Sequence, residues 1–457
     1  MKKRFSLFLA LSLLLVISSV IVQAQDKITV TWFVGLGGGT ELQQIDAQNQ
    51  VVADFNASQD AIELVITIAP SYETGRDVMS TLIAAGTPPD IVGPVGVGGS
   101  NAYIDQWADL TSLVDASGFD LSVFDPALVD LYRDGDALVG IPFAVFPSVM
   151  YYNRSLFDEA GLEYPPSEFG EPYVLDGEEV EWNYETVAEI AKILTVDADG
   201  NDATMDGFDP NNVIQFGLNF QWALQRLIWS DMQPEDIYDP AANSLVIPES
   251  WRTATEWLQD GIWNSSFIPN TTYSNSELFG SDNVFQSGNL AMAITPLWYT
   301  CCLGDSVGNF EWDFAVVPRS FDGEYHVSTD ADTFRLTKGS ANPEAAFTVL
   351  SYLLTDAAST LAPTYGAFPA HPDYQQPFLD SKAEQYPFVE NWDIVAASLA
   401  YNNPGNMHHE AWFPNWQKGT DRIAAFNTLL FGETGADIDI QAELDALEAD
   451  LNSIANE

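Results

Sequence analysis

Basic residues, histidine, cysteine and long apolar segments are all scarce in this sequence. Only 16 of its 457 residues are Lys or Arg, against 66 Asp or Glu, and the formal charge of -50 repels nucleic acids and anionic membrane surfaces. The four histidines show no zinc-ligand spacing. Beyond the first 24 residues, no stretch is long and apolar enough to span a membrane. We therefore expect no nucleic-acid partner and no zinc centre.

The rest of the composition is that of a folded protein. Hydrophobic residues make up 46% of the chain and aromatic residues 12%, far more than an acidic disordered tail contains. The length is about three times that of a common single domain, which favours at least two compact lobes. The acidic charge must then coat a folded, soluble body.

The first 24 residues are typical of an export signal. Lys2, Lys3 and Arg4 precede an apolar run over residues 5–22, and the small Ala24 offers a cleavage site. No cysteine stands at that site, so we expect no lipid anchor and predict a free periplasmic or extracellular protein. An N-terminal membrane anchor is the alternative. Cleavage would leave 13 basic against 66 acidic residues, a formal charge of -53.

The order of elements after the signal predicts an α/β fold. Residues 28–34 and 63–68 are strand-like, and a helical stripe that includes Leu42, Val52 and Phe55 separates them. A strand, a helix and a strand in this order predict a parallel sheet covered by helices. Glycine-rich loops at residues 35–39 and 93–99 follow strands, where ligand clefts of open α/β sheets lie.

A second lobe is predicted after residue 144. Residues 138–145 and 149–152 indicate two apolar strands that carry the chain across, and residues 314–318 indicate a return crossing. Asn342 before Pro343 is a good helix start, and Leu444, Leu447, Leu451 and Ile454 indicate a final amphipathic helix.

Four blocks in this order resemble the extracellular solute-binding proteins of ABC importers, in the group that includes the maltose-binding protein. The first is Gly-Ile-Pro-Phe at 140–143, followed by Tyr-Tyr-Asn-Arg-Ser-Leu-Phe at 151–157. The others are F-x-x-G-x-x-A-M at 285–292, Trp-Asp-Phe to Pro at 312–318, and Tyr-Leu-Leu-Thr-Asp at 352–356. Together they span residues 140–356, about half of the chain after the signal.

The resemblance implies a periplasmic-binding-protein fold of type II, with two discontinuous α/β lobes and a ligand cleft between them. We expect residues 25–144 and 320–357 in lobe 1 and residues 145–319 and 358–457 in lobe 2, with hinge crossings near 142–147, 317–321 and 355–361. Such a protein is no enzyme and needs no cofactor. It closes on its solute and is recognised by the transmembrane subunits of an ABC transporter. We expect a monomer.

The aromatic content favours a neutral saccharide as the solute, because sugar C–H faces stack on aromatic rings while hydroxyl groups need hydrogen-bond partners. In the resembled family a sugar-stacking tryptophan follows the corresponding strand, which implies this role for Trp298. Looser matches to the family suggest the same role for Trp222 and Trp412. Core packing is the alternative for each of the three. The aromatic positions and polar neighbours expected in the cleft are Trp298 and Tyr299, Gln221 and Trp222, and Glu410 and Trp412.

The glycine-rich loops should supply backbone amides to ligand hydroxyls, because glycine allows close approach. The positions singled out are Gly38, Gly39 and Thr40 in the first loop and Gly96 and Ser100 in the second. These loops lack the charged and aromatic residues of the maltose-binding pattern, and Phe146 replaces the carboxylate of its crossing strand, which argues against maltodextrin specificity. Asp330 and Asp332 are expected to accept hydroxyl hydrogen bonds near the hinge, unless they form a solvated turn.

The only two cysteines, Cys301 and Cys302, are adjacent and follow Trp298 by three residues. In an exported protein they would tend to oxidise. The Cα atoms of neighbours lie roughly 3.8 Å apart, below the usual disulfide range, so a bridge would be strained and would stiffen the turn. We hypothesise that a vicinal disulfide forms part of the cleft wall; two unbridged sulfurs are the alternative.

An acidic loop offers oxygen ligands at alternating positions, as a hard cation such as Ca²⁺ requires. Its candidate metal ligands are Asp197, Asp199, Asn201 and Asp206. The EF-hand pattern is incomplete, because its glycine and its final glutamate are missing, and an acidic turn without metal is the alternative.

Two other functions remain open at this stage. A secreted glycoside hydrolase needs two carboxyl groups at a fixed separation, and 66 acidic residues allow many pairs without favouring one. A receptor of the same fold could bind a glycerol phosphate ester or a peptide, although few basic residues are present to bind an anion.

Overall fold

The computed structural model describes residues 27–223, 238–239, 241–280, 283–304, 308–401 and 414–457. The expected signal at 1–24 and the expected ligand residues Glu410 and Trp412 lie outside these ranges. Within them the fold is mixed α/β, as the sequence predicts.

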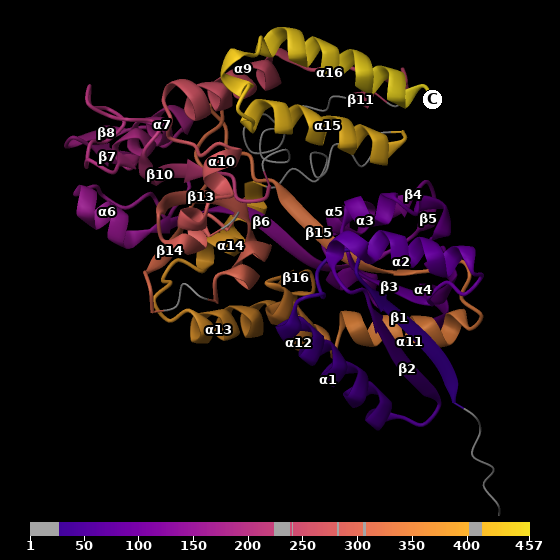
Figure 1. Cartoon of the computed structure of the whole chain (residues 1–457). Helices are drawn as coiled ribbons and strands as arrows, with labels where there is room; N and C mark the ends of the chain where they lie inside the picture. The colour runs from indigo at the N-terminus through magenta and orange to yellow at the C-terminus, as the bar shows by residue number, and fades with distance from the viewer. Residues whose placement is uncertain (1–26, 224–237, 240, 281–282, 305–307, 402–413) are drawn as a thin grey trace, which may run out of the picture.

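A ten-stranded sheet forms the centre of the molecule (Figure 1). Its main path runs β2-β1-β3-β15-β6-β13-β10-β9, and β14 and β16 also pair with β6. The expected parallel pairing is confirmed, because β1 is parallel to both β2 and β3, and β10 is parallel to β13. The strands are β1 (Ile28–Val34), β2 (Ile62–Ile68), β3 (Ile91–Val95), β6 (Ile141–Asn153), β9 (Val196–Asp197), β10 (Val213–Asn219), β13 (Leu290–Pro296), β14 (Trp312–Ala315), β15 (Thr329–Leu336) and β16 (Phe368–Pro369).

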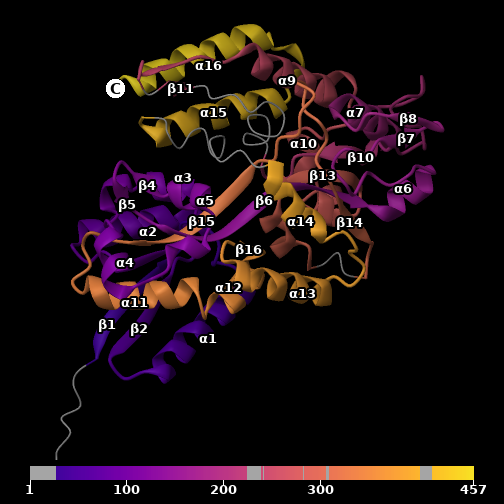
Figure 2. The same cartoon turned by 180° about the vertical axis from the view of Figure 1, so that it is seen from behind.

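Helices cover both halves of the sheet (Figure 2), and the described residues also form three short hairpins that are separate from it. The hairpins are β4 (Arg133–Asp134) with β5 (Ala137–Leu138), β7 (Tyr173–Leu175) with β8 (Glu178–Val180), and β11 (Tyr238–Asp239) with β12 (Ser244–Leu245). The helices before β13 are α1 (Leu42–Ser58), α2 (Tyr72–Ala84), α3 (Val97–Asn101), α4 (Thr111–Ser117), α5 (Pro126–Asp130), α6 (Arg154–Ala160), α7 (Tyr184–Ile193), α9 (Glu249–Gln259) and α10 (Thr271–Ser274). Those after β15 are α11 (Pro343–Leu354), α12 (Ala358–Tyr365), α13 (Gln375–Gln385), α14 (Asp393–Ser398), α15 (Trp416–Phe431) and α16 (Ile440–Ala455).

Strand β6 joins the two halves of the sheet. It is one strand of 13 residues, every one of them buried, rather than the two strands expected at 138–145 and 149–152. Its residues up to Pro147 pair with β15, and its residues from Ser148 onward pair with β13 and β14. A strand that is buried on both faces needs mostly apolar side chains, which explains its largely hydrophobic sequence.

The second crossing is made by β15 and not by residues 317–321. The backbone N–H groups of Val316 and Arg319 donate to Pro166 and Trp182, in the same half as β13. β15 then pairs with β3 and with the first half of β6. Short strand β16 also pairs with that first half, and α12 lies against α1. Pairing therefore continues across the expected boundaries at 144/145 and 357/358, and the division into two lobes stays a prediction.

The α1 stripe differs from the expected one. Leu42 is 75% exposed, whereas Gln44 and Gln48 are buried with Val51 and Phe55. The two glutamine side chains reach back to the first glycine-rich loop, where Gln44 accepts from the Gly39 N–H at 2.8 Å and Gln48 donates to the Gly39 carbonyl at 2.8 Å. Apolar periodicity alone misses this, because the buried polar groups serve a loop outside the helix.

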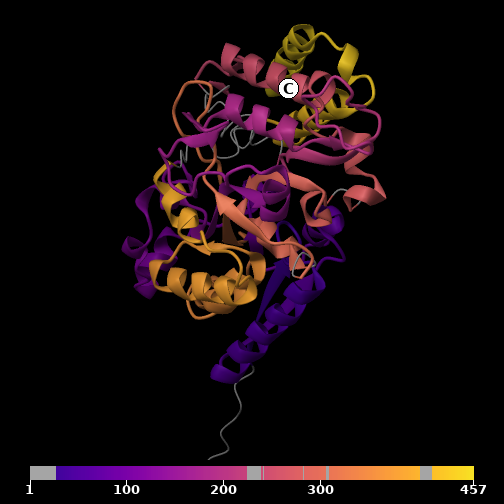
Figure 3. The same cartoon turned by 90° about the vertical axis from the view of Figure 1, so that its left-hand side faces the viewer.

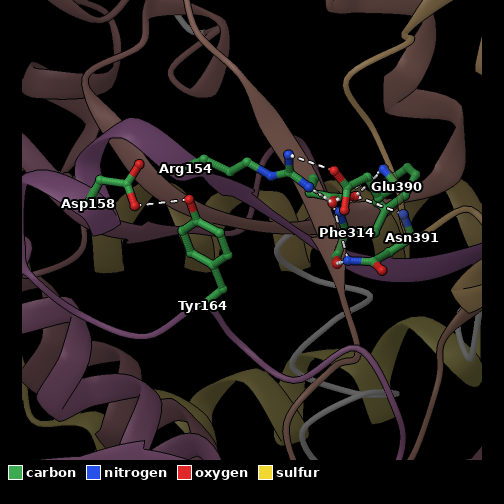
Figure 4. Close-up of polar contacts among 7 residues, drawn as sticks. Arg154, Asp158, Tyr164, Phe314, Glu390 and Asn391 are labelled. Atoms are coloured by element: carbon green, nitrogen blue, oxygen red, sulfur yellow. Dashed lines mark hydrogen bonds and ion pairs between the residues drawn. The ribbon is translucent and has the colours of Figure 1, made fainter.

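A buried ion pair fixes the far end of β6 (Figure 4). Arg154 bonds to Asp313, whose side chain is fully buried and also accepts from the backbone N–H groups of Phe314, Glu390 and Asn391. Burial raises the pKa of Asp313, and hydrogen bonds to the backbone and the Arg154 charge oppose that rise. The pair thus ties β6 and β14 to the segment before α14.

The two ends of the described chain lie at opposite ends of the molecule, with α1 near one and the C-terminal helices α15 and α16 at the other (Figure 3). Among the described residues, no single helix has the length and apolar character to cross a membrane. α11 and α12 together meet those criteria only as a pair bent by 62°.

Candidate functional site

A cleft of about 660 Å³ lies where the glycine-rich loops, the two crossing strands and the C-terminal helices meet. It brings together most of the positions singled out from the sequence. Those that line it are Gly38, Gly39, Thr40, Gly96, Phe146, Trp222, Trp298, Cys301, Cys302, Asp330 and Asp332.

The glycine-rich loops form one wall because their backbones pack closely. A Cβ atom on Gly37 would lie 2.5 Å from the Pro94 carbonyl oxygen, and one on Gly96 would lie 2.9 Å from the Asp332 carboxylate. Gly39 has φ +109°, a conformation open mainly to glycine. Its amide already donates to Gln44, so this N–H supports the loop and not a ligand.

A hydrogen bond holds the Trp298 side chain beside the start of strand β15. Its indole Nε1 donates to the Asp330 carboxylate at 2.9 Å, which links the segment after β13 to the crossing strand. Asp330 is buried, and Asp332 lies two residues further along the same strand, where both line the cleft with Phe146. The alternative of a solvated turn is therefore wrong, because both carboxylates belong to strand β15.

Cys301 and Cys302 form a disulfide, as hypothesised, with Cα atoms 3.8 Å apart. They end a 3₁₀ helix, η7 (Leu297–Cys302), that starts directly after β13 and also carries Trp298. Both sulfur-bearing residues are half-buried and line the cleft.

Trp222 has 43% of its surface exposed and a φ of +56°. Its ring packs edge-on against Tyr299, with centroids 5.4 Å apart. A positive φ is unusual for a bulky residue, and such conformations cluster at functional sites. The core-packing alternative is thus wrong for Trp222.

Among the described residues, three further cleft-lining side chains carry a buried polar atom without a hydrogen-bond partner, and the sequence did not single them out. They are the Tyr365 hydroxyl, the Trp416 Nε1 and the Thr420 hydroxyl. Tyr365 is 4% exposed and Trp416 is 7% exposed. Burial, and after it the Asp332 carboxylate, raises the pKa of Tyr365, which keeps its hydroxyl protonated.

Arg76 of α2 is the single basic residue among the described residues that line the cleft. Its guanidinium lies 5.1 Å from the centroid of the Trp416 ring on α15, and it donates to Gln417 on the same helix. The Trp416 ring also meets the second loop, since a Cβ atom on Gly98 would lie 3.2 Å from it. These contacts span the cleft from α2 to α15, and we call them the α2–α15 clasp.

Three expected ligand residues lie behind the cleft wall. Tyr299 is fully buried, and its hydroxyl donates to Asn283. Gln221 accepts from the Val284 N–H at 3.1 Å. Ser100 accepts from Arg335 at 3.2 Å. Each of these side chains holds a residue or segment next to the cleft. The sequence alone does not distinguish such a residue from a cleft-lining residue one or two positions away.

The acidic loop is organised around Asp197, which is 1% exposed. Burial alone would raise the pKa of this carboxyl, but hydrogen bonds from the backbone of Asp209, Asn201 and Asp199 and from the Asn201 side chain outweigh it and lower the pKa to about 2. Asp206 is exposed. Within the described ranges, no group of three or more His, Cys, Asp or Glu is placed to hold a metal ion.

A family model for bacterial extracellular solute-binding proteins matches residues 40–360. The chain belongs to this family. A binding protein of Brucella abortus is 21% identical over 410 residues, 87% of this chain and 89% of that protein. The arabinooligosaccharide-binding protein of Halalkalibacterium halodurans is 23% identical over 271 residues, 57% of this chain and 55% of that protein.

Solved structures of solute-binding proteins share the fold. A substrate-binding protein of Listeria monocytogenes, solved with cycloalternan, superposes with a TM-score of 0.68 at 20% identity, over 94% of this chain and 99% of that one. The expected fold, a periplasmic-binding protein of type II, is confirmed. The cleft described above lies at the joint between the two halves of its sheet.

Proposed function

We propose that this solute-binding protein is a receptor that binds a neutral oligosaccharide in the cleft and delivers it to an ABC permease. The observation that carries the proposal is the set of three polar atoms, on Tyr365, Trp416 and Thr420, that line the cleft without a partner. A buried polar group without a hydrogen bond is costly, so a bound molecule with hydroxyl groups would be favoured there.

The other lining groups suit the same ligand. Trp298 and Trp222 offer indole surface to sugar C–H faces, and the Asp330 and Asp332 carboxylates accept hydrogen bonds from hydroxyl groups. Saccharides also fit the names of two relatives, since one binds arabinooligosaccharide and one was solved with cycloalternan.

An anionic solute fits the cleft poorly. Among the described residues, its charged lining consists of the acids Glu41, Asp330 and Asp332 and the base Arg76, which is already engaged with α15. A phosphate ester in the cleft would lie among these carboxylates, which repel an anion. The proposal therefore favours a neutral solute over the glycerol phosphate ester.

A thermal-shift screen with isothermal titration calorimetry tests the proposal. Maltose, maltotriose, cycloalternan and arabinotriose should be compared with glycerol phosphate esters and oligopeptides. A saccharide present at 100 times its Kd should stabilise the native protein by about 2.7 kcal/mol. A shift only with peptides or anions, or release of sugar products in the same mixtures, contradicts the proposal.

Delivery to a permease and export through the N-terminal signal belong to the same proposal. The family is one of extracellular solute-binding proteins, which supports both. Cleavage after Ala24 predicts that the exported chain begins at Gln25, which N-terminal sequencing checks.

A further inference from the structure

The helix η7 places Trp298 and Cys301 on the same side of one short turn. A 3₁₀ helix has three residues per turn, so side chains at positions i and i+3 lie one above the other. Trp298 and Cys301 are such a pair, and both line the cleft. Leu297 and Thr300, the pair on another side of the turn, are fully buried.

Contacts from three directions hold the backbone of this turn. The Tyr386 hydroxyl donates to the Thr300 carbonyl at 2.9 Å, and the Asn283 amide donates to the Cys302 carbonyl at 3.1 Å. From α12, Gly366 lies so close that a Cβ atom on it would be 2.6 Å from the Thr300 hydroxyl. The turn is therefore anchored in the core while its cleft side carries the indole and the disulfide.

The disulfide adds an apolar, polarisable surface next to the Trp298 ring. Sulfur is a weak hydrogen-bond acceptor, and the bridge has no donor. Asp330 fixes the neighbouring indole through its Nε1, so the ring keeps one orientation beside the bridge. Such a rigid surface suits the C–H face of a sugar ring, whose hydroxyls then point to the polar groups elsewhere in the cleft.

We infer that the Cys301–Cys302 disulfide is a ligand-contacting part of the cleft, on which the C–H face of one sugar unit rests beside Trp298. The inference rests on the proposed function. It adds a contact that is sensitive to redox state, because two thiols would replace the bridge on reduction. In that step a dithiol transfers two electrons and two protons to the disulfide and itself becomes a cyclic disulfide.

The test measures saccharide affinity of the oxidised protein, of the protein reduced with dithiothreitol, and of the double variant C301S/C302S. The probe is the member of the set maltose, maltotriose, cycloalternan and arabinotriose that gives the largest thermal shift. Reduction and the double substitution should each weaken binding by about tenfold, because a rigid apolar contact is lost. Dithiothreitol should leave the affinity of C301S/C302S unchanged, which controls for effects of the reductant elsewhere.

A second measurement requires no variant, and it does not require the reduced protein to stay folded. The rate at which dithiothreitol reduces the disulfide, followed by alkylation and intact mass, should fall when the saccharide probe is bound, since the sugar covers the sulfurs. Equal reduction rates with and without saccharide, or unchanged affinity on reduction, overturn the inference. If no saccharide shifts the oxidised protein, the proposed function fails first.

Discussion

The Tyr365 hydroxyl is buried in the cleft wall without a partner, and this predicts opposite effects of its removal on stability and on binding. Without ligand, the hydroxyl adds the cost of an unsatisfied buried polar group, about 1 kcal/mol or more. Tyr365→Phe should leave the free energy of unfolding unchanged or raise it by about that amount. Saccharide affinity should fall about tenfold, as one hydrogen bond is lost. Chemical denaturation and calorimetry measure the two quantities.

Tyr132 supplies a matched control, because its hydroxyl is also buried and unpartnered but does not line the cleft. Tyr132→Phe should leave saccharide affinity unchanged. Equal losses of affinity in both variants would show that the Tyr365 hydroxyl acts through the fold and not through the ligand.

Asp197 predicts a pH dependence of stability in acid. Its pKa in the folded state is about 2, below the ordinary value near 3.9 for an unfolded aspartate. The carboxylate form is therefore favoured by folding, and its contribution is complete above about pH 4 and is lost as the pH falls towards about 2. Asp197→Ala should lower stability at pH 6, and the difference from the wild-type protein should shrink between pH 4 and pH 2.

The control for this prediction is Asp206, an exposed residue of the same loop. Asp206→Ala should change the stability at pH 6 by less than about 0.5 kcal/mol, because an exposed side chain makes few contacts. A constant difference between Asp197→Ala and the wild-type protein down to pH 2 would contradict the assignment of the stabilisation to the Asp197 carboxylate.

Many of the cleft-lining residues at strand ends could be predicted from the sequence. The cleft-lining residues on helices could not be predicted from the apolar pattern of those helices. The glycine loops follow strands, a place where sequence order alone predicts a ligand, whereas Trp298 and Asp330 were expected from the family resemblance and the hinge that it implies. Tyr365 and Trp416 stand at the end of α12 and the start of α15. Nothing in an amphipathic stripe separates a side chain that faces a cleft from one that faces the core.

Among the elements, those that pair with sequence neighbours were predictable. β1, α1 and β2 form a local strand-helix-strand unit, and α11 starts after Asn342 as the capping pattern predicts. β6 and β15 were less predictable, because their partners lie as far as 245 residues away in sequence (Ile91 and Leu336) and their pairing depends on the whole fold. The apolar residues of β6 indicate that the strand is buried, but they do not indicate which strands pair with it.

The ion pair at the end of β6 predicts a large loss of stability when one partner is removed. Arg154→Met would leave the fully buried Asp313 carboxylate without its cation, which costs about 3 kcal/mol. Arg133→Met is the matched control, because its pair with Asp130 is exposed and should contribute less than about 1 kcal/mol. Chemical denaturation of both variants checks the difference. A loss below 1 kcal/mol for Arg154→Met would show that hydrogen bonds to the backbone alone support Asp313.

At the scale of the whole molecule, two strands connect the halves of the sheet, and the α2–α15 clasp connects them again across the cleft. An opening motion that bends β6 and β15 as one pair would leave the hydrogen bonds between these two strands intact. The clasp joins two helices that have no such link, so it is the contact that opening would break. In the opening and closing motion that the proposed function implies, the clasp would therefore favour the closed arrangement.

Arg76→Ala should shift the protein without ligand towards the open arrangement, since it removes the cation from the Trp416 ring and the hydrogen bond to Gln417. Small-angle X-ray scattering should then give a larger radius of gyration without saccharide and the wild-type value with saccharide bound. Because closure precedes or accompanies tight binding, affinity should fall by about fivefold for every saccharide that binds, whatever its size. Arg422→Ala, which breaks a pair with Asp450 between α15 and α16 only, should change neither quantity. A loss confined to one saccharide would instead make Arg76 a direct ligand contact, and an unchanged radius of gyration would show that the clasp does not govern opening.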